Sequence, residues 1–173
     1  MKNSEKKYNV LERDLIDFYE EKQSELFGHC HPKIAQSRLQ AFDYLKSNGL
    51  PTTALESWKN TNLEQHYNDS FQLDNPVTKF EKSIGEIFQC EVHGFDTDVI
   101  SMLNGRYYSP EEKHLQTLDN GVVVGSIIAA QNAYPELFDT YFDETAGDQQ
   151  NGLCAANKAI FRDGVFVYVP DGV

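Results

Sequence analysis

The chain has 173 residues, of which 40% are hydrophobic and 12% aromatic, and its formal net charge is −12. This composition supplies enough apolar surface for one folded domain and excludes wholesale disorder. So acidic a chain should be repelled by phosphate backbones and anionic lipids, which argues against nucleic-acid and membrane partners. Three cysteines are too few for a disulfide framework, and we expect neither a signal peptide nor a membrane span; the sequence therefore predicts a soluble, cytoplasmic protein.

The negative charge is concentrated in one part of the chain. Residues 1–82 carry a net charge of −2, residues 83–157 carry −10, and residues 158–173 are balanced. The run from Glu136 to Asp148 holds five acidic side chains and no basic one. Such a run usually forms a solvated surface, and the alternative is an acidic docking surface for a basic partner.

The first fifty residues are predicted to form two helices. Apolar residues recur at helical spacing through residues 5–27, and Gly28 is typical of a helix end. His31-Pro32 is expected to open a second helix that stops at Asn48-Gly49. The predicted apolar face of this second helix comprises Ala35, Leu39, Phe42 and Leu45.

The next segment is shorter and more polar. Thr53 and Glu56 have the spacing of a capping box, which predicts a short helix with Leu55 and Trp58 in its core. Residues 62–75 are rich in Asn, Gln, Asp and Ser, so we expect a hinge there.

The middle of the chain is predicted to contain strands. Residues 76–84 are expected to form one or two helical turns, and residues 87–92 a strand. Asn104-Gly105 lies between two apolar runs and readily adopts a type I′ turn, so residues 99–108 should form a hairpin. Gly121–Gly125 should be a strand that runs into a helix. That helix is predicted from the apolar residues Ile127, Ile128, Ala130, Tyr134, Leu137, Phe138 and Tyr141.

The last part is predicted to be a helix followed by a hairpin. The helix spans residues 152–158, and Asp163-Gly164 is expected to join strands at residues 159–161 and 165–169. The last strand is apolar at five successive positions, so it should need cover on both faces and a neighbour on its free edge. We expect that neighbour in another chain, as in a homodimer, or in sequence beyond Val173.

Together these elements predict an α+β fold. An N-terminal helical bundle segment over residues 1–66 should precede an α+β region over residues 67–173. The second region should contain a small mixed sheet with hairpins and helices.

His29-Cys30-His31 is the densest group of metal-ligating residue types. Adjacent side chains point apart, so a zinc site would need a further ligand from Cys90 or His93. The simpler interpretation is two ordinary histidines and a buried cysteine in a turn between helices.

Cys154 is the other candidate for chemistry, because the start of a helix can lower the pKa of a thiol. A thiol nucleophile would need His66, His93 or His114 as its base, and no local motif supports such a pair. Calcium-loop, phosphate-loop and hydrolase motifs are absent. The residues alone therefore indicate no active site, and they leave a small thiol- or metal-dependent enzyme and a standalone acidic interaction module as alternatives.

Four blocks in order give a resemblance to a known family. The first has the pattern Arg-x-x-Ala, Gly-x-Pro and Glu-x-Trp-Lys-x-Thr-x-Leu, and it resembles the N-terminal signature of SufD in the SufB/SufD family of iron–sulfur cluster assembly proteins. The last block is similar to the segment that leads into the family's β-helical core. The blocks are Arg38–Leu63, Leu103–Arg106, Asp119–Val123 and Leu153–Gly172.

The resemblance implies a scaffold function without enzymatic activity. The chain would be the N-terminal part of a SufD-like subunit in a SufBCD-type complex, with SufB-like and SufC-like subunits as its partners. The complex would build iron–sulfur clusters with ATP hydrolysed by the SufC-like ATPase, and this part would bind no cofactor itself. A parallel β-helix, truncated here, would follow the last strand. No catalytic, cofactor-binding or metal residue is carried over, because the family's functional histidine lies in the later part.

Overall fold

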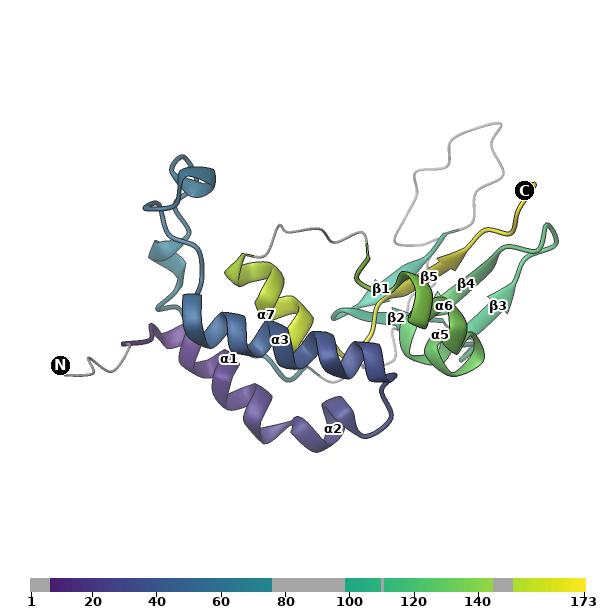
Figure 1. Cartoon of the computed structure of the whole chain (residues 1–173), viewed down its shortest axis with the longest axis horizontal. Coiled ribbons are helices and arrows are strands. Elements are labelled where there is room, and N and C mark those ends of the chain that lie inside the picture. The colour runs from purple at the N-terminus through teal and green to yellow at the C-terminus, as the bar shows by residue number, and fades with distance from the viewer. Residues whose placement is uncertain (1–6, 76–98, 110, 145–150) are drawn as a thin grey trace. The chain divides into compact units, whose positions relative to one another are not determined.

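The computed structural model describes residues 7–75, 99–109, 111–144 and 151–173 (Figure 1). The chain divides into two compact units, and it passes from one to the other three times. The boundary predicted after residue 66, between a helical region and an α+β region, stays a prediction. Unit 1 comprises Met1–Asp74 and Glu136–Phe161, and unit 2 comprises Asn75–Pro135 and Arg162–Val173.

Unit 1 is built from helices. The helix predicted over residues 5–27 is confirmed from Val10 onward and in two parts, because the backbone leaves helical geometry at Lys22 (φ −99°, ψ 11°). The second predicted helix is confirmed, with Pro32 in its first turn. The elements are α1 (Val10–Glu21), α2 (Gln23–Phe27), α3 (Pro32–Asn48), the 3-10 turns η1 (Glu56–Trp58) and η2 (Glu64–His66), α6 (Pro135–Tyr141) and α7 (Gly152–Ile160).

A capping box that was not predicted starts α1. The side-chain oxygen Oδ1 of Asn9 accepts the N–H of Glu12 at 2.8 Å, and Oε2 of Glu12 accepts the N–H of Asn9 at 3.0 Å. The other carboxylate oxygen of Glu12 accepts the N–H of Leu50 at 2.8 Å, just after α3 ends. This buried carboxylate therefore caps one helix and holds the chain that leaves another.

The capping box predicted at Thr53 and Glu56 is wrong. Thr53 donates its N–H and its hydroxyl to Oε2 of Glu64, at 3.1 and 2.9 Å, and so does not cap a helix. Only the single turn η1 forms here. Leu55 is 50% exposed and Trp58 is half-buried, so the core predicted for this segment is also wrong.

The core of unit 1 is formed mainly by α1, α3 and α7, and Figure 1 shows α7 lying along α3. Small residues let the two helices approach closely. A Cβ atom on Gly152 would lie 2.0 Å from the carbonyl oxygen of Gly49. The buried cluster comprises Leu15, Tyr19, Leu26, Ala41, Phe42, Leu45, Leu50, Tyr67, Ala155, Ala156 and Ala159.

The buried face of α3 is rotated relative to the predicted one. Leu39 is 54% exposed, so its predicted place in the core is wrong. A stripe that starts at Ile34 and follows helical spacing faces inward instead, and this stripe includes a charged residue. Its members are Ile34, Ser37, Arg38, Ala41, Phe42 and Leu45.

Unit 2 contains two small antiparallel sheets. The predicted Asn-Gly hairpin is confirmed, because Asn104 and Gly105 both have positive φ angles, 50° and 76°. The second sheet has the order β3-β4-β5 and was predicted only in part. The elements are β1 (Ser101–Leu103), β2 (Arg106–Tyr108), β3 (Leu115–Thr117), β4 (Val123–Ser126), α5 (Ile127–Ala133) and β5 (Val165–Tyr168).

Three predictions in this part need correction. The helix predicted through Ile127 and Tyr141 is two helices, because Pro135 lacks an N–H to continue the ladder and starts α6. The strand predicted at residues 159–161 is wrong, since Ala159 and Ile160 complete α7. The hairpin predicted at Asp163-Gly164 is therefore wrong as well, because β5 follows a helix and pairs with β4. Strand β3, which pairs with the other edge of β4, is an element that was not predicted.

Other predictions lie outside the described residues. These are the helical turns at residues 76–84 and the strand at residues 87–92, together with Cys90 and His93. The parallel β-helix expected after the last strand also stays a prediction.

Candidate functional site

A buried arginine links α3 to α7 inside unit 1. Arg38 is 1% exposed, and its Nη1 donates to the carbonyl oxygen of Ala159 at 3.1 Å. Its guanidinium carbon lies 4.1 Å from the centre of the Phe161 ring, a cation–π contact. Burial lowers the pKa of Arg38, and the nearby Cys30 and Tyr19 side chains oppose this lowering.

The surroundings of Arg38 hold no compensating carboxylate among the described residues. The Nε of Arg38 and the hydroxyl of Tyr19 are buried without a hydrogen-bond partner there. Burial also raises the pKa of Tyr19, whose ring stacks on Phe42 with centroids 3.7 Å apart. In the sequence Arg38 belongs only to a family pattern, and nothing in its spacing indicates a buried cation.

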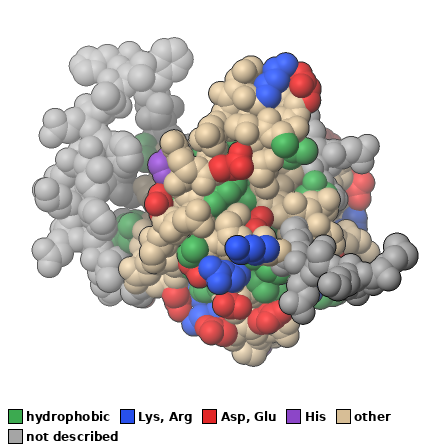
Figure 2. Space-filling model, turned by 90° about the vertical axis from the view of Figure 1, so that its left-hand side faces the viewer, with side chains coloured by type: hydrophobic (Ala, Val, Ile, Leu, Met, Phe, Trp, Pro, Cys, Tyr) green, Lys and Arg blue, Asp and Glu red, His purple; other side chains and the backbone are tan. Residues whose placement is uncertain are grey.

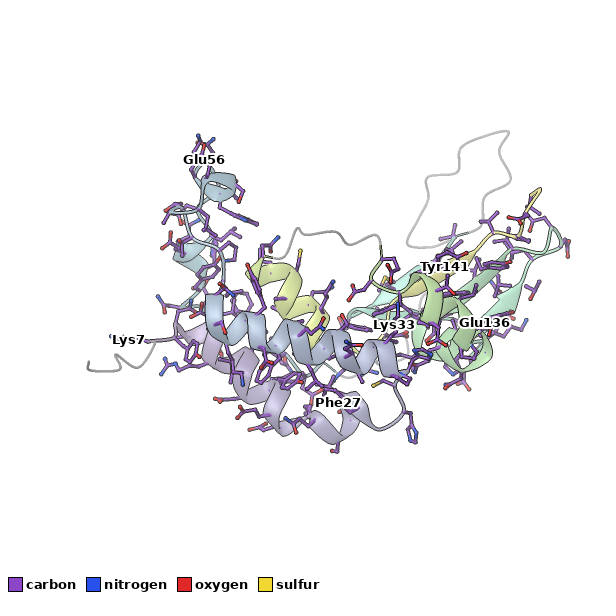
Figure 3. All side chains as sticks on the ribbon, in the orientation of Figure 1. Lys7, Phe27, Lys33, Glu56, Glu136 and Tyr141 are labelled. Carbon is purple, nitrogen blue, oxygen red and sulfur yellow. The ribbon has the colours of Figure 1, made fainter. Side chains whose placement is uncertain are left out.

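A second polar cluster joins the end of α6 to α3 and α7. Asp143 accepts hydrogen bonds from Ser37 and from Nζ of Lys158, the latter at 2.5 Å. Burial alone would raise the pKa of Asp143, but these two donors and the positive charge of Lys33 together lower it. Lys33, labelled in Figure 3, also pairs with Glu144 at 2.9 Å.

The acidic run from Glu136 to Asp148 is thus partly used inside unit 1. Asp143 and Glu144 pair with α3 or α7, and Oδ1 of Asp139 lies 3.6 Å from Nε2 of His31. Glu136 and Tyr141 of α6 are exposed (Figure 3). On the face drawn in Figure 2, basic and acidic side chains lie beside one another rather than in separate patches.

His31 and Cys30 have structural roles at the start of α3. Nδ1 of His31 accepts the N–H of Lys33 at 3.3 Å, so His31 is the N-cap of this helix. The Cys30 thiol contacts the carbonyl oxygen of Phe27 at 3.8 Å, and His29 is exposed. The zinc hypothesis also needs Cys90 or His93, which the structure does not describe. Within the described ranges, no three metal-ligating side chains come together.

Cys154 lies in the first turn of α7, as the sequence predicts, and its side chain is exposed. Asn151 caps this helix and donates to the Cys154 sulfur at 3.3 Å. His66 pairs instead with Asp69 at 3.0 Å, and both His66 and His114 are exposed. His93 is not described. The thiol-enzyme hypothesis therefore gains no catalytic pair from the part of the chain that the structure describes.

The chain that follows α3 forms a closed surface loop. The Tyr67 hydroxyl donates to the carbonyl oxygen of Pro51 at 2.5 Å, and this bond closes a loop over residues 51–67. Glu56, at the outer end of the loop in Figure 3, pairs with Lys59. Compact loops of this kind often carry binding residues.

Unit 2 has its own polar centre at Asp163. Oδ2 of Asp163 accepts the N–H of Tyr107 at 3.0 Å, and Oδ1 accepts the Ser126 hydroxyl at 2.7 Å. Asp163 thus connects the β1–β2 hairpin to the β4–α5 junction, whereas its place in the sequence predicts only a turn residue. In the described ranges, no helix is both long and apolar enough to cross a membrane.

Comparisons with known proteins give one consistent result. Residues 9–173 match the model of a family described as the SufBD protein N-terminal region. Over 99 residues the chain is 31% identical to the iron–sulfur cluster assembly SufBD family protein ABCI9 of Arabidopsis thaliana, which covers 57% of this chain and 19% of that protein.

Two further relatives match shorter stretches. The SufBD family protein slr0074 of Synechocystis is 36% identical over 55 residues, covering 32% of this chain and 12% of that protein. The chloroplastic protein ABCI8 of Arabidopsis thaliana is 38% identical over 58 residues, covering 33% and 10%. The matched stretches thus span less than a fifth of each of these relatives. No solved structure matches.

Proposed function

Because the chain belongs to the SufBD family, as its N-terminal region, we propose that it serves in iron–sulfur cluster assembly as a scaffold without enzymatic activity. The family match over residues 9–173 carries this proposal. The named relatives are iron–sulfur cluster assembly proteins. The four blocks of the sequence analysis favour a SufD-like member.

The proposal extends to a complex. The chain would be the N-terminal part of a subunit that works in the cytoplasm with a SufB-like subunit and a SufC-like ATPase. Iron–sulfur clusters would be the cargo of this complex, and ATP would be hydrolysed by the ATPase subunit. A parallel β-helix in the remainder of the subunit would continue from unit 2. This chain would bind neither ATP nor a cluster.

The use of polar groups in unit 1 supports a scaffold. Arg38 and Asp143 hold α7 against α3, and His31 caps α3. These groups are engaged in packing and capping, so they are suited to fixing a shape rather than to turning over a substrate.

Complementation tests the proposed function. The full-length gene that contains this chain is expressed in a strain that lacks its iron–sulfur assembly system. We expect growth and the activity of iron–sulfur enzymes to be restored, and the full-length protein to co-purify with SufB-like and SufC-like subunits. Failure of both would refute the assembly function.

Metal analysis tests whether the chain is a metal-dependent enzyme instead. The purified chain is expected to hold no stoichiometric zinc or iron. Stoichiometric metal that is lost in Cys30→Ser, but kept in the control Cys154→Ser, would favour the metal-dependent alternative instead.

A further inference from the structure

The chain contains the dipeptide Asn-Gly at four places, and this dipeptide is prone to a spontaneous rearrangement of the backbone. In the rearrangement the backbone nitrogen of the glycine attacks the amide carbon of the asparagine side chain. A residue with a Cβ would crowd that nitrogen, and glycine does not. The four dipeptides are Asn48-Gly49, Asn104-Gly105, Asn120-Gly121 and Asn151-Gly152. Their hydrogen bonds decide which of them can react.

Two of the four dipeptides are held at helix ends. The N–H of Gly49 donates to the carbonyl oxygen of Leu45 at 2.8 Å, at the end of α3. Asn151 is the N-cap of α7, and its Oδ1 accepts the N–H groups of Leu153 and Cys154, both at 3.0 Å. Attack at either place would require the end of the helix to open first.

Asn120-Gly121 lies in the turn between β3 and β4, and its own groups hold that turn. The N–H of Gly121 donates to the carbonyl oxygen of Leu118 at 2.9 Å. The side-chain oxygen Oδ1 of Asn120 accepts the N–H of Val122 at 3.1 Å. Asn120 is exposed, but both reacting groups of this dipeptide are engaged in hydrogen bonds.

Asn104-Gly105 differs because another residue closes its turn. In a two-residue hairpin turn, the closing hydrogen bond is donated by the residue that follows the two central ones. Here that residue is Arg106, which pairs with Leu103. The turn therefore does not use the N–H of Gly105, and Asn104 and Gly105 are both exposed.

The backbone of Asn104 is also close to the shape of the cyclic intermediate. A five-membered ring between a side chain and the next nitrogen holds ψ at about −120°, which with φ at about +60° is the first central position of a type II′ turn. Asn104 has a φ angle of 50°. Types I′ and II′ differ by rotation of the central peptide, and both are favoured in hairpins. Gly105 adopts either sign of φ, so the ring can close while the hairpin is kept.

We propose that Asn104-Gly105 is a modification site, at which the chain rearranges itself to isoaspartate. The nitrogen of Gly105 loses its proton to hydroxide and forms a bond to Cγ of Asn104. The bond from Cγ to Nδ2 breaks, and Nδ2 takes a proton from water and leaves as ammonia, which regenerates the hydroxide. The product of this step is a succinimide. The site goes beyond the proposed scaffold function and does not depend on it.

Water then opens the succinimide ring. It adds to one of the two ring carbonyl carbons and breaks the bond from that carbon to the nitrogen of Gly105. Opening at Cγ gives aspartate, and opening at the main-chain carbonyl carbon gives isoaspartate. Direct hydrolysis of the side chain would give aspartate alone, so isoaspartate identifies the cyclic route.

The product changes the β1–β2 hairpin in two ways. Isoaspartate carries the main chain through its Cβ and Cγ, so the turn gains a backbone atom between Leu103 and Arg106. The new carboxylate adds a negative charge to a chain whose net charge is −12. The next residue of β2, Tyr107, donates its N–H to Asp163 at 3.0 Å. The altered turn should therefore weaken the contact that connects this hairpin to the β4–α5 junction.

Peptide mass spectrometry of the full 173-residue chain, after incubation at neutral and at mildly alkaline pH, tests the proposal. Isoaspartate should accumulate at Asn104, and faster at the higher pH, because the attacking nitrogen must lose its proton. Asn120 should react at least about tenfold more slowly, since two hydrogen bonds must break first. In concentrated urea the two sites should react at equal rates, because the turns are lost.

Asn104→Gly is the matched variant. Gly-Gly also favours a type I′ turn, so the circular dichroism spectrum should be kept while the formation of isoaspartate in this turn is lost. Asn120→Gly, in the other turn, is the control and should leave the rate at Asn104 unchanged. Equal rates at Asn104 and Asn120 in the folded chain would overturn the proposal. A preference for Asn104 that persists in urea would overturn it as well, because the turn would then not be its cause.

Discussion

Single carboxylates fasten separate pieces of this chain together. Glu12 bonds to Asn9 and to Leu50, and Asp163 bonds to Tyr107 and Ser126. In each case the two oxygens of one carboxylate accept hydrogen bonds from two donors that are distant from each other in the sequence. Bonds of this kind to a charged acceptor are among the stronger ones in proteins.

Arg38 presents the opposite situation, a buried cation without a described carboxylate. Removing its long side chain should leave a cavity under α7, so Arg38→Ala should lower the free energy of unfolding by about 3 kcal/mol. Arg38→Met keeps most of the packed volume and removes a charge that is costly to bury. It should stay within about 1 kcal/mol of the wild type.

Urea denaturation followed by circular dichroism measures both Arg38 variants. The comparison separates the packing of the side chain from its charge. If Arg38→Met destabilises as strongly as Arg38→Ala, the guanidinium itself stabilises unit 1 through Ala159 and Phe161, and the explanation by volume is wrong.

The contact between helices α3 and α7 depends on the absence of a side chain at one position. A Cβ atom on residue 152 would lie 2.0 Å from the oxygen of Gly49 and 2.7 Å from Cα of Leu50. Both are backbone atoms that cannot move aside. Gly152→Ala should therefore push α7 outward and lower the free energy of unfolding by about 3 kcal/mol.

Chemical denaturation again provides the measurement for Gly152→Ala. Asn157→Ala, at an exposed position on the same helix, is the matched control and should change the stability little. Equal stability of the two variants would mean that α7 can shift without loss, contrary to the close packing described above.

Asp143 makes the contact of α6 with α3 and α7 sensitive to acid. Its folded pKa lies below its unfolded value of about 4, because Lys158, Ser37 and Lys33 together outweigh the effect of burial. Its contribution to stability is therefore complete above about pH 4 and is lost as the pH falls through the folded pKa. Asp143→Asn should remove this contribution, about 1 kcal/mol at neutral pH.

The test is the free energy of unfolding of wild type and Asp143→Asn between neutral pH and about pH 2. The two curves should converge at the acid end. Asparagine suits the positive φ angle of 67° at this position, so the backbone is not newly strained. Asp17→Asn on the exposed side of α1 is the control, and its curve should follow that of the wild type at every pH. A loss of stability at neutral pH as large as that of Asp143→Asn would contradict the role given to Asp143.

Local patterns predicted the elements better than they predicted which face of an element is buried. The Asn104-Gly105 hairpin and the start of α3 at Pro32 depend on the backbone preferences of these residues themselves, so both can be predicted from the sequence. The burial of Arg38 instead of Leu39 depends on where α7 packs. That position lies more than one hundred residues away, and no local pattern contains it.

Motif spacing was likewise ambiguous. Both Asn9-x-x-Glu12 and Thr53-x-x-Glu56 have the spacing of a capping box, and only the first forms one. Glu64 is placed by the fold beside Thr53 and takes its donors. For the candidate site, Cys154 at a helix start was predictable, whereas the pairing of Asp143 with Lys158 was not.

On the scale of the whole molecule, neither unit is a continuous stretch of sequence. The buried cluster of unit 1 needs α7, and the second sheet of unit 2 needs β5. A fragment of residues 1–75 would carry the N-terminal helices without Ala155, Ala156 and Ala159. We expect this fragment to lack a cooperative thermal transition by circular dichroism, because its apolar stripe stays open to water.

A peptide of residues 136–161 added to that fragment should restore helical structure, because it supplies the missing face. An unrelated peptide of equal length and charge is the control. A cooperative transition of the 1–75 fragment alone would contradict this expectation and would favour an independent N-terminal domain close to the one predicted from the sequence.

The link from Arg38 to Ala159 crosses 121 positions of the chain, and this separation bears on how the protein is made. A helical unit with only local contacts would fold as it leaves the ribosome, but this one cannot complete its core until α7 has been synthesised. At roughly 5–20 residues per second, the N-terminal helices wait on the order of ten seconds with their apolar faces exposed. During that interval chaperones should bind the exposed apolar faces of the nascent chain. The folding rate should be limited by the closure of one long loop rather than by helix formation.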